Sequence, residues 1–208
     1  MTSIKKLSNL NGRSIVITGA TGNLGTAMCH SLAELGAELI LIDRHGSDFK
    51  QLKKELTSKW NVDCSSYECD LEIEEDRIKV IKDILSTYKN ISCLINNAAF
   101  VGTSKLSGWV SPFEEQSLET WRRAVEVNLT AVFHLSQALA PTLKKSDGGN
   151  IINISSIYGE YGPDWSLYDG LDMASPAAYA ASKGGVSQLT RWLATTLSPD
   201  IRVNAISP

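Results

Sequence analysis

Short apolar segments alternate along the chain with longer segments in which apolar residues recur at helical spacing. Five of the six apolar segments are rich in Ile, Leu and Val, and the third is more polar. Near-continuous apolar runs are typical of strands that are buried on both faces of a parallel sheet. We therefore predict six strands, at residues 14–19, 37–43, 63–69, 91–99, 150–156 and 201–207.

Helices are predicted between these strands, at residues 23–35, 47–60, 72–88, 118–144 and 176–197. Gly36 can cap the first helix, Pro141 can bend the fourth, and Pro176 suits the first turn of the fifth. Repeated strand–helix alternation predicts an α/β fold, a doubly wound parallel sheet with helices on both faces. We expect a single domain that covers residues 1–208.

Composition and charge are those of an ordinary globular protein. The 208 residues are 43% hydrophobic and 21% charged, and the net charge of −3 gives no reason to expect a nucleic-acid partner. No apolar run approaches the roughly 20 residues of a membrane helix, and the N-terminus has no signal-peptide core. The four cysteines lack zinc-like spacing, so we expect reduced thiols and no metal site. We predict a cytoplasmic protein without a membrane partner.

The turn after the first predicted strand is rich in glycine. The sequence Thr-Gly-Ala-Thr-Gly-Asn-Leu-Gly places Gly19, Gly22 and Gly25 between a strand and a helix. Glycines at such a turn let backbone amides approach a pyrophosphate at the positive end of the helix. We interpret it as a dinucleotide-binding loop rather than a purely structural turn, because an acidic residue ends the second strand.

That acidic residue is Asp43, 18 positions after Gly25. A carboxylate there can accept both hydroxyls of an adenosine ribose and would repel a 2′-phosphate, which favours NAD over NADP. Arg44 could reach a 2′-phosphate, so NADP remains open. Asp70 ends the third strand, where it can meet the adenine ring and also cap the helix that begins near Glu72.

Tyr179 is the only tyrosine that is followed four positions later by a lysine, Lys183. Residues at this spacing are neighbours on a helix, and an ammonium beside a phenol favours the phenolate. Such a tyrosine can exchange a proton with an alcohol or a carbonyl near neutral pH. Taken alone, the spacing is more typical of a solvated helix surface. Ser156 and Asn97 change that balance, because they end the fifth and fourth strands at the edge where such sheets bind ligands.

Together these motifs resemble the short-chain dehydrogenase/reductase family, in its compact branch. The matching stretches are TGATGNLG, Asp43, CDL, NNAA, VNL, NISS, YAASK and IRVNAISP, in family order along the whole chain. The resemblance implies a Rossmann-like fold and an NAD(P)-dependent oxidoreductase acting on a secondary alcohol or ketone. It also implies a homodimer or homotetramer, paired through the helices at 118–144 and 176–197.

The resemblance implies roles for individual residues. Tyr179 would be the acid/base, and Lys183 would favour its phenolate form and hold the nicotinamide ribose. Ser156 would bind the substrate oxygen, and Asn128 would complete a proton relay through water to Lys183. The other residues expected in the cofactor cleft are Gly19, Thr21, Gly22, Asn23, Leu24, Gly25, Asp43, Arg44, Asp70, Leu71, Asn97, Ala98, Ala99 and Pro208.

Three features depart from the family pattern. Asn23 stands at the usual middle glycine, and because asparagine tolerates left-handed backbone we expect the loop to form with altered detail. Ala99 replaces a common glycine. Ser156 and Tyr179 are 23 positions apart, farther than is usual in the family, and the residues between them include an aromatic loop at 157–175.

The aromatic loop leaves the active-site edge and returns to it, so it is predicted to border the substrate pocket. It can bind a polyhydroxylated substrate by stacking and hydrogen bonds, or it can be a surface excursion packed on its own aromatics. It is similar to loops of surface-glycan and flagellin-modification oxidoreductases and of gluconate 5-dehydrogenase-like enzymes, which implies a sugar-derived substrate. The candidate residues are Tyr158, Tyr161, Asp164, Trp165 and Tyr168.

Two other functions remain open. One is a nucleotide-sugar epimerase or dehydratase with tightly held NAD, favoured by the glycine spacing. The other is a non-catalytic NAD-binding scaffold. The four candidate catalytic residues argue against it, because a scaffold does not need them.

Family members continue past the final Ile-Ser-Pro, so a substrate lid and a last strand are expected to be missing. The oligomer interface or the core is expected to hold Trp121, Trp192, Leu193 and Leu197.

Overall fold

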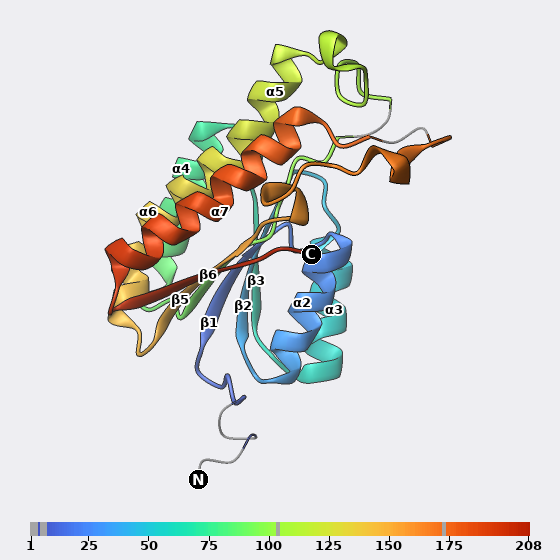
Figure 1. Cartoon of the computed structure of the whole chain (residues 1–208). Helices are drawn as coiled ribbons and strands as arrows, with labels where there is room; N and C mark the ends of the chain where they lie inside the picture. The colour runs from blue at the N-terminus through green and yellow to red at the C-terminus, as the bar shows by residue number, and fades with distance from the viewer. Residues whose placement is uncertain (1–3, 5–7, 103–104, 172–173) are drawn as a thin grey trace.

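Six parallel strands form one sheet in the computed structural model, which describes residues 4, 8–102, 105–171 and 174–208. The strand order is β3-β2-β1-β4-β5-β6, and every adjacent pair is parallel (Figure 1). All six predicted strands are present, within a few residues of their expected ends. Their bounds are β1 Ser14–Thr18, β2 Glu38–Asp43, β3 Cys64–Glu68, β4 Cys93–Asn96, β5 Gly149–Ile154 and β6 Ile201–Ile206.

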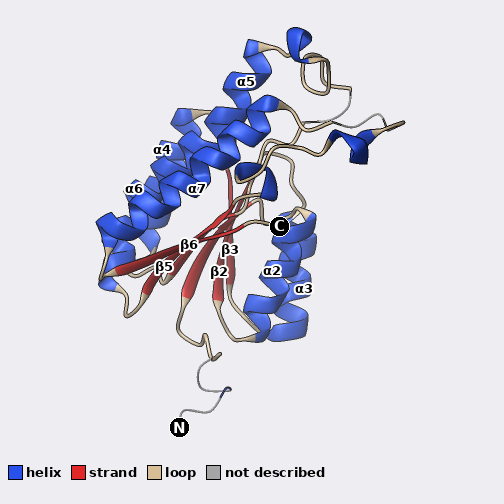
Figure 2. Cartoon of the chain, viewed as in Figure 1, coloured by secondary structure: helices blue, strands red, loops and turns tan. Residues whose placement is uncertain are grey.

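Helices cover both faces of the sheet (Figure 2). Those that follow β1 and β2 lie on one face, α2 (Asn23–Glu34) and α3 (Phe49–Trp60). The later helices lie on the other face, namely α4 (Glu74–Thr87), α5 (Leu118–Val125), α6 (Ala131–Lys145) and α7 (Ala177–Leu197). The predicted doubly wound α/β architecture is therefore confirmed. None of the helices in the described residues is long and apolar enough to cross a membrane.

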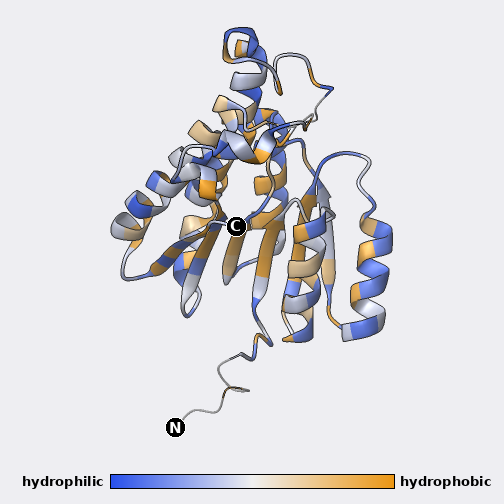
Figure 3. Ribbon diagram, turned by 45° about the vertical axis from the view of Figure 1, so that its right-hand side comes forward, coloured by the Kyte–Doolittle hydropathy of each residue, from blue (hydrophilic) through white to orange (hydrophobic). Residues whose placement is uncertain are grey.

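Alternate residues of the inner strands face opposite helical layers. Ile15 and Ile17 of β1 pack in the cluster that includes α2 and α3, whereas Val16 packs with α4, α6 and α7. The buried members of both clusters are at most 8% exposed, which explains why the strands are apolar without alternation (Figure 3). Of the apolar residues expected at an interface or in the core, Leu193 lies in the core and Leu197 packs against it.

The long helix expected at 118–144 is interrupted by a π-helical segment, η2 (Glu126–Thr130), which joins α5 to α6. Pro141 lies inside α6, which continues beyond it to Lys145, so the helix does not end at the proline. A π turn inside an α-helix changes the direction in which nearby side chains point and is frequent at functional sites. Asn128 lies at the centre of η2 and is fully buried.

The strand order changes direction between β1 and β4, which opens a crevice at the carboxyl edge of the sheet. Two long connections rise above this edge (Figure 1). One runs from β4 to α5 and contains the short helix η1 (Phe113–Glu115). The other is the aromatic loop, with the short helices η3 (Ile157–Gly159) and η4 (Trp165–Tyr168); its residues 172–173 lie outside the described part.

Candidate active site

The glycine loop after β1 depends on two of its three glycines. Gly19 has φ +65°, and a Cβ there would lie 2.9 Å from Cα of Ala98. A Cβ on Gly25 would lie 2.0 Å from the carbonyl oxygen of Gly19, so only glycine lets α2 approach the loop so closely. Gly22 has φ −71° and would meet the same oxygen at an ordinary 3.4 Å.

Asn23 does not use left-handed backbone, contrary to the reason given for expecting the loop to form. It is the first residue of α2, and among the described non-glycine residues only Asn61 has a positive φ. The loop takes its left-handed turn at Gly19, so position 23 needs no such freedom. No side chain caps α2, whose N-cap is Gly22, and its first amides are therefore open to an anion.

Thr18, a residue that the sequence analysis did not single out, ties the glycine loop to the end of β4. Its hydroxyl accepts hydrogen bonds from the backbone N–H groups of Asn97 and Ala98, both at 3.0 Å. The Asn97 side-chain amide donates to the carbonyls of Thr18 and Gly19, at 2.9 and 3.0 Å. These hydrogen bonds fix the predicted cofactor residues at the end of β1 and those that follow β4 relative to one another. Its signal in the sequence is its place as the first residue of the stretch TGATGNLG, at the end of the first predicted strand.

The Asp43 carboxylate is bound by the protein itself. Its Oδ2 accepts from the backbone N–H and the hydroxyl of Thr21, at 2.8 and 2.7 Å, and its Oδ1 accepts from the Arg44 N–H at 2.8 Å. A carboxylate has about four acceptor sites, so part of its capacity remains for a ligand. Arg44 is exposed beside it.

Asp70 does not cap the helix that follows it. Its Oδ1 accepts from the Glu72 N–H at 3.0 Å, but α4 begins at Glu74 and its N-cap is Ile73, which has no capping side chain. The helix starts two residues later than expected because Asp70–Ile73 form a separate hydrogen-bonded turn. Leu71 of this turn is buried.

Lys183 is 2% exposed and lies on α7, one turn after Tyr179. Its ammonium donates to the carbonyl of Ile154 at 2.6 Å and lies 5.8 Å from the centre of the Tyr179 ring. Burial lowers the pKa of Lys183 to about 8. Tyr179 and Lys183 are therefore not a solvated helix surface but a phenol beside a desolvated amine.

Asn128 is joined to the same helix. Its Nδ2 donates to the hydroxyl of Ser182 at 3.0 Å, and that hydroxyl donates to the carbonyl of Tyr179 at 2.9 Å. Its Oδ1 accepts from the Phe100 N–H at 2.6 Å. The sequence analysis missed Ser182, which only its position three residues after Tyr179 could have indicated.

Ser156 lies where the strand end meets α7. Its hydroxyl accepts from the Tyr158 N–H at 3.2 Å, and the neighbouring Ser155 donates to the Lys183 carbonyl at 3.1 Å. A Cβ on Gly159 would lie 2.8 Å from that carbonyl, so η3 packs directly on the backbone of α7. The Pro208 carbonyl accepts from the Ile157 N–H at 3.2 Å, which places the described end of the chain beside this cluster.

The aromatic loop is held partly by its own side chains. The hydroxyls of Tyr158 and Tyr168 are hydrogen-bonded to each other, and this contact raises the pKa of Tyr168 to about 12. Trp165 packs against Tyr168 with 5.9 Å between ring centres. Tyr161 is 75% exposed. Asp164 accepts from the Ser166 N–H and starts η4.

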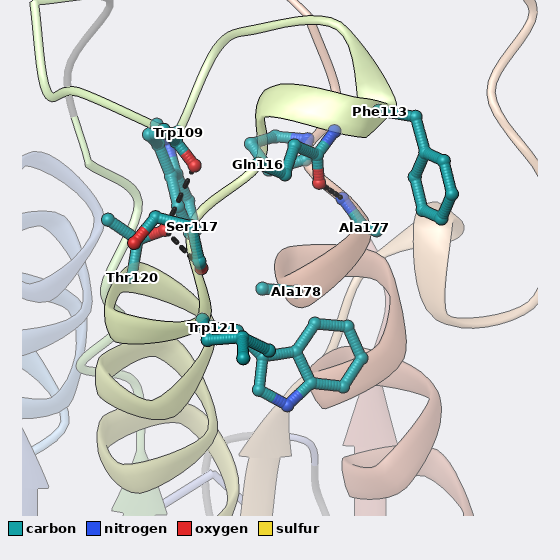
Figure 4. Close-up of a pocket in the computed structure, with 11 residues that line it drawn as sticks. Trp109, Phe113, Gln116, Ser117, Thr120, Trp121, Ala177 and Ala178 are labelled. Atoms are coloured by element: carbon teal, nitrogen blue, oxygen red, sulfur yellow. Dashed lines mark hydrogen bonds between the residues drawn. The ribbon is translucent and has the colours of Figure 1, made fainter.

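Two cavities lie above the sheet edge. The larger, of about 540 Å³, lies between the two long connections and α7; Trp165 and Ser175 of the aromatic loop line it, together with Ala180, the residue after Tyr179. The smaller, of about 320 Å³, lies between the first turns of α5 and α7 (Figure 4). There Trp109 and Phe113 lie on opposite sides with Trp121 below them, and Gln116 accepts from the Ala177 N–H at 3.1 Å.

Comparison with known proteins gives a consistent result. The family model described as short chain dehydrogenase matches residues 13–208. L-fucose dehydrogenase of Mus musculus is 30% identical over 203 residues, 97% of this chain and 66% of that protein. A tropinone reductase homolog of Arabidopsis thaliana is 32% identical over 202 residues, 96% of this chain and 70% of that protein. The chain thus spans about two thirds of the length of these relatives.

Solved structures show the same likeness. A short chain dehydrogenase from Shigella flexneri, complexed with NADP, has a TM-score of 0.83 and 29% identity, covering 97% of this chain and 78% of that one. An NAD⁺-bound xylitol dehydrogenase has a TM-score of 0.81 and 32% identity, covering 96% of this chain and 70% of that one.

Proposed function

Because the chain belongs to the short-chain dehydrogenase family, we propose that it is an NAD(P)-dependent oxidoreductase acting on a secondary alcohol or ketone. The observation that carries this proposal is the buried Lys183 ammonium, 5.8 Å from the centre of the Tyr179 ring. In a site of low dielectric constant, that charge acts strongly on a neighbouring phenol.

In this proposal Tyr179 is the acid/base. Beside the Lys183 ammonium, it takes the hydroxyl proton of an alcohol in oxidation and returns it to a carbonyl oxygen in reduction. Ser156 donates a hydrogen bond to that oxygen, and Asn128 holds a water-mediated proton relay to Lys183. A bound nicotinamide would accept the hydride in oxidation or supply it in reduction.

The glycine loop fits a dinucleotide. The space that side chains at Gly19 and Gly25 would fill stays open, and the first amides of α2 lack a capping side chain. Both features suit a pyrophosphate. Asp43 would then face the adenosine ribose, and we propose NAD as the preferred cofactor because a 2′-phosphate would meet this carboxylate. Among the similar solved structures, one is complexed with NADP, one is complexed with NADPH and one is named an NADPH-dependent reductase, whereas one is bound to NAD⁺. Titration with both dinucleotides tests the preference.

The proposed substrate is polyhydroxylated. Two of the similar proteins are named for L-fucose and xylitol. In the larger cavity, Trp165 offers an indole for stacking, and Ser111 and Ser175 have buried hydroxyls without a partner among the described residues. Such hydroxyls gain most from a ligand that supplies the missing hydrogen bonds. Tyr158, Tyr161 and Tyr168 remain candidate contacts, although two of these hydroxyls are paired with each other.

A homodimer or homotetramer is proposed through α5, α6 and α7. Trp121 is 40% exposed and Trp192 is 56% exposed, and these two large apolar side chains lie on α5 and α7. Exposed aromatic residues on neighbouring helices are typical of a protein interface.

The test of the function begins with titrations of the purified protein with NADH and with NADPH, followed by a screen of sugars, polyols and sugar acids. Tyr179→Phe should then lower kcat by at least about a thousandfold while changing dinucleotide affinity less than about threefold. Tyr88→Phe is the matched control, because it removes a hydroxyl that is bonded to Ser65 away from the site. Residual activity of Tyr179→Phe within a few-fold of the native rate would rule out the proposed mechanism.

A further inference from the structure

Arg77, in the first turn of α4, is buried to 2% exposure, and its partners lie in the turn before α4, in η2 and in α6. Burying a guanidinium is costly unless its donors are matched by acceptors, and arginine is rarely buried without such partners. The position of this arginine therefore calls for a reason beyond packing.

Each of the three nitrogens of Arg77 has an acceptor. Its Nη1 donates to the Leu71 carbonyl, its Nη2 donates to Glu126 Oε1 at 2.6 Å, and its Nε donates to His134 Nδ1 at 3.3 Å. The guanidinium is a rigid planar fork, so its acceptors must keep fixed positions relative to one another. A shift of one acceptor is transmitted to the other two.

These acceptors belong to two different parts of the site. Leu71 lies in the turn Asp70–Ile73, which is expected at the adenine end of the cofactor cleft. Glu126 begins the π-helical segment η2, and His134 lies in α6 just after that segment ends. Arg77 thus holds η2 on both flanks of Asn128.

A second arginine reaches the same turn from α5. Arg123 of α5 donates from Nε to both carboxylate oxygens of Glu72, at 2.9 and 3.1 Å, and its guanidinium lies over the Phe100 ring. This pair is partly exposed, with 36% of the arginine side chain and 30% of the glutamate side chain accessible. Among the described residues the Arg123 side chain has no hydrogen bond to η2, so the pair provides a comparison for an ion pair at the same turn. Its link toward Asn128 is the contact with the Phe100 ring.

We propose that Arg77 is a positioning residue that couples the turn Asp70–Ile73 to η2, so that a dinucleotide bound at the turn steadies Asn128. The proposal rests on the proposed function, because it assigns the turn to the cofactor cleft. The physical link is the shared guanidinium: a ligand that fixes the Leu71 backbone also fixes the fork, and the fork fixes Glu126 and His134. Asn128 is then held in the orientation that its bonds to Phe100 and Ser182 require.

Hydrogen exchange provides a readout that does not depend on turnover. In the native protein, saturating NADH or NADPH should slow amide exchange in peptides that cover residues 124–134. Arg77→Met should still bind the dinucleotide but lose this protection, and its kcat should fall by about tenfold, with little change in KM for the substrate. Arg123→Met is the matched control: it removes the ion pair but can still pack on Phe100, and it should keep the protection.

Milder substitutions distinguish a loss of coupling from a failure to fold. The melting temperature of each variant is measured first, and if Arg77→Met does not fold, Arg77→Lys and Glu126→Gln replace it, each expected to lose part of the protection. Unchanged protection in the Arg77 and Glu126 variants, or an equal loss in Arg123→Met, would overturn the coupling while leaving the proposed function intact. If the native protein binds neither dinucleotide, both the proposed function and the coupling fail.

Discussion

Lys183→Met should stabilise the fold while abolishing activity. Below pH 8 Lys183 is protonated in both the folded and unfolded chain, and burial lowers its folded pKa from 10.5 to about 8. A fall of this size means that the folded chain carries a charge whose burial costs about 3 kcal/mol. Methionine has a similar length and no charge. The lost hydrogen bond from the charged ammonium to the Ile154 carbonyl offsets about 1.5–3 kcal/mol, which leaves a net gain of up to about 2 kcal/mol.

The gain should depend on pH in a defined direction. Between pH 8 and 10.5 the folded chain binds fewer protons at Lys183 than the unfolded chain, so the native protein becomes more stable as the pH rises through this window. The advantage of Lys183→Met is therefore complete below pH 8 and declines above it. In a chain of this size, a gain of up to about 2 kcal/mol raises the melting temperature by up to about 8 °C.

Thermal and urea unfolding of the ligand-free protein, from pH 6.5 to 10, tests this prediction. Lys79→Met is the control, because the Lys79 side chain is 76% exposed and pairs with Asp83 on its own helix. Cysteines and tyrosines also titrate in this range, but they are the same in all three proteins, so the difference isolates Lys183. A variant less stable than the native protein at pH 7, with a difference that does not change with pH, would refute the reasoning.

Two other predictions concern the glycine loop and the exposed ion pairs of His45. Gly25→Ala should destabilise the fold by about 1–3 kcal/mol and abolish dinucleotide binding, since its Cβ would lie 2.0 Å from the Gly19 carbonyl, whereas Gly22→Ala should be tolerated. Urea unfolding and NADH titration compare the two, and equal behaviour would contradict the contact analysis. Hydrogen bonds that the His45 ring donates to the carboxylates of Asp76 and Glu68 raise the pKa of His45 above 6.5, and NMR titration should show it falling in Asp76→Asn. A pKa unchanged by this substitution would argue against that ion pair in solution.

The local pattern predicted most of the fold. Strands buried on both faces must be apolar along their length, so the apolar runs around Ile17, Leu41 and Ile151 predicted where these strands lie in the sequence. Gly19 and Gly25 were predictable for a similar reason, since the sharp turn and the close approach of α2 leave no room for a side chain. The spacing of Tyr179 and Lys183 placed both on one side of a helix before any tertiary contact was known.

The sequence by itself determined which segments are strands and helices, in which order they follow, and which side chains reach the carboxyl edge of the sheet. Tertiary structure decided what those side chains contact. The burial of Lys183 depends on Ile154, 29 residues away, and the Arg77 contacts with Glu126 span 49 residues. The π-helical segment at Asn128 could not be predicted from the sequence either, because a change in helical hydrogen bonding does not alter the spacing of the apolar residues. The spacing of apolar residues along the chain predicts the secondary structure of each segment. The hydrogen-bond partners of a side chain and its burial depend on residues that are distant in the chain.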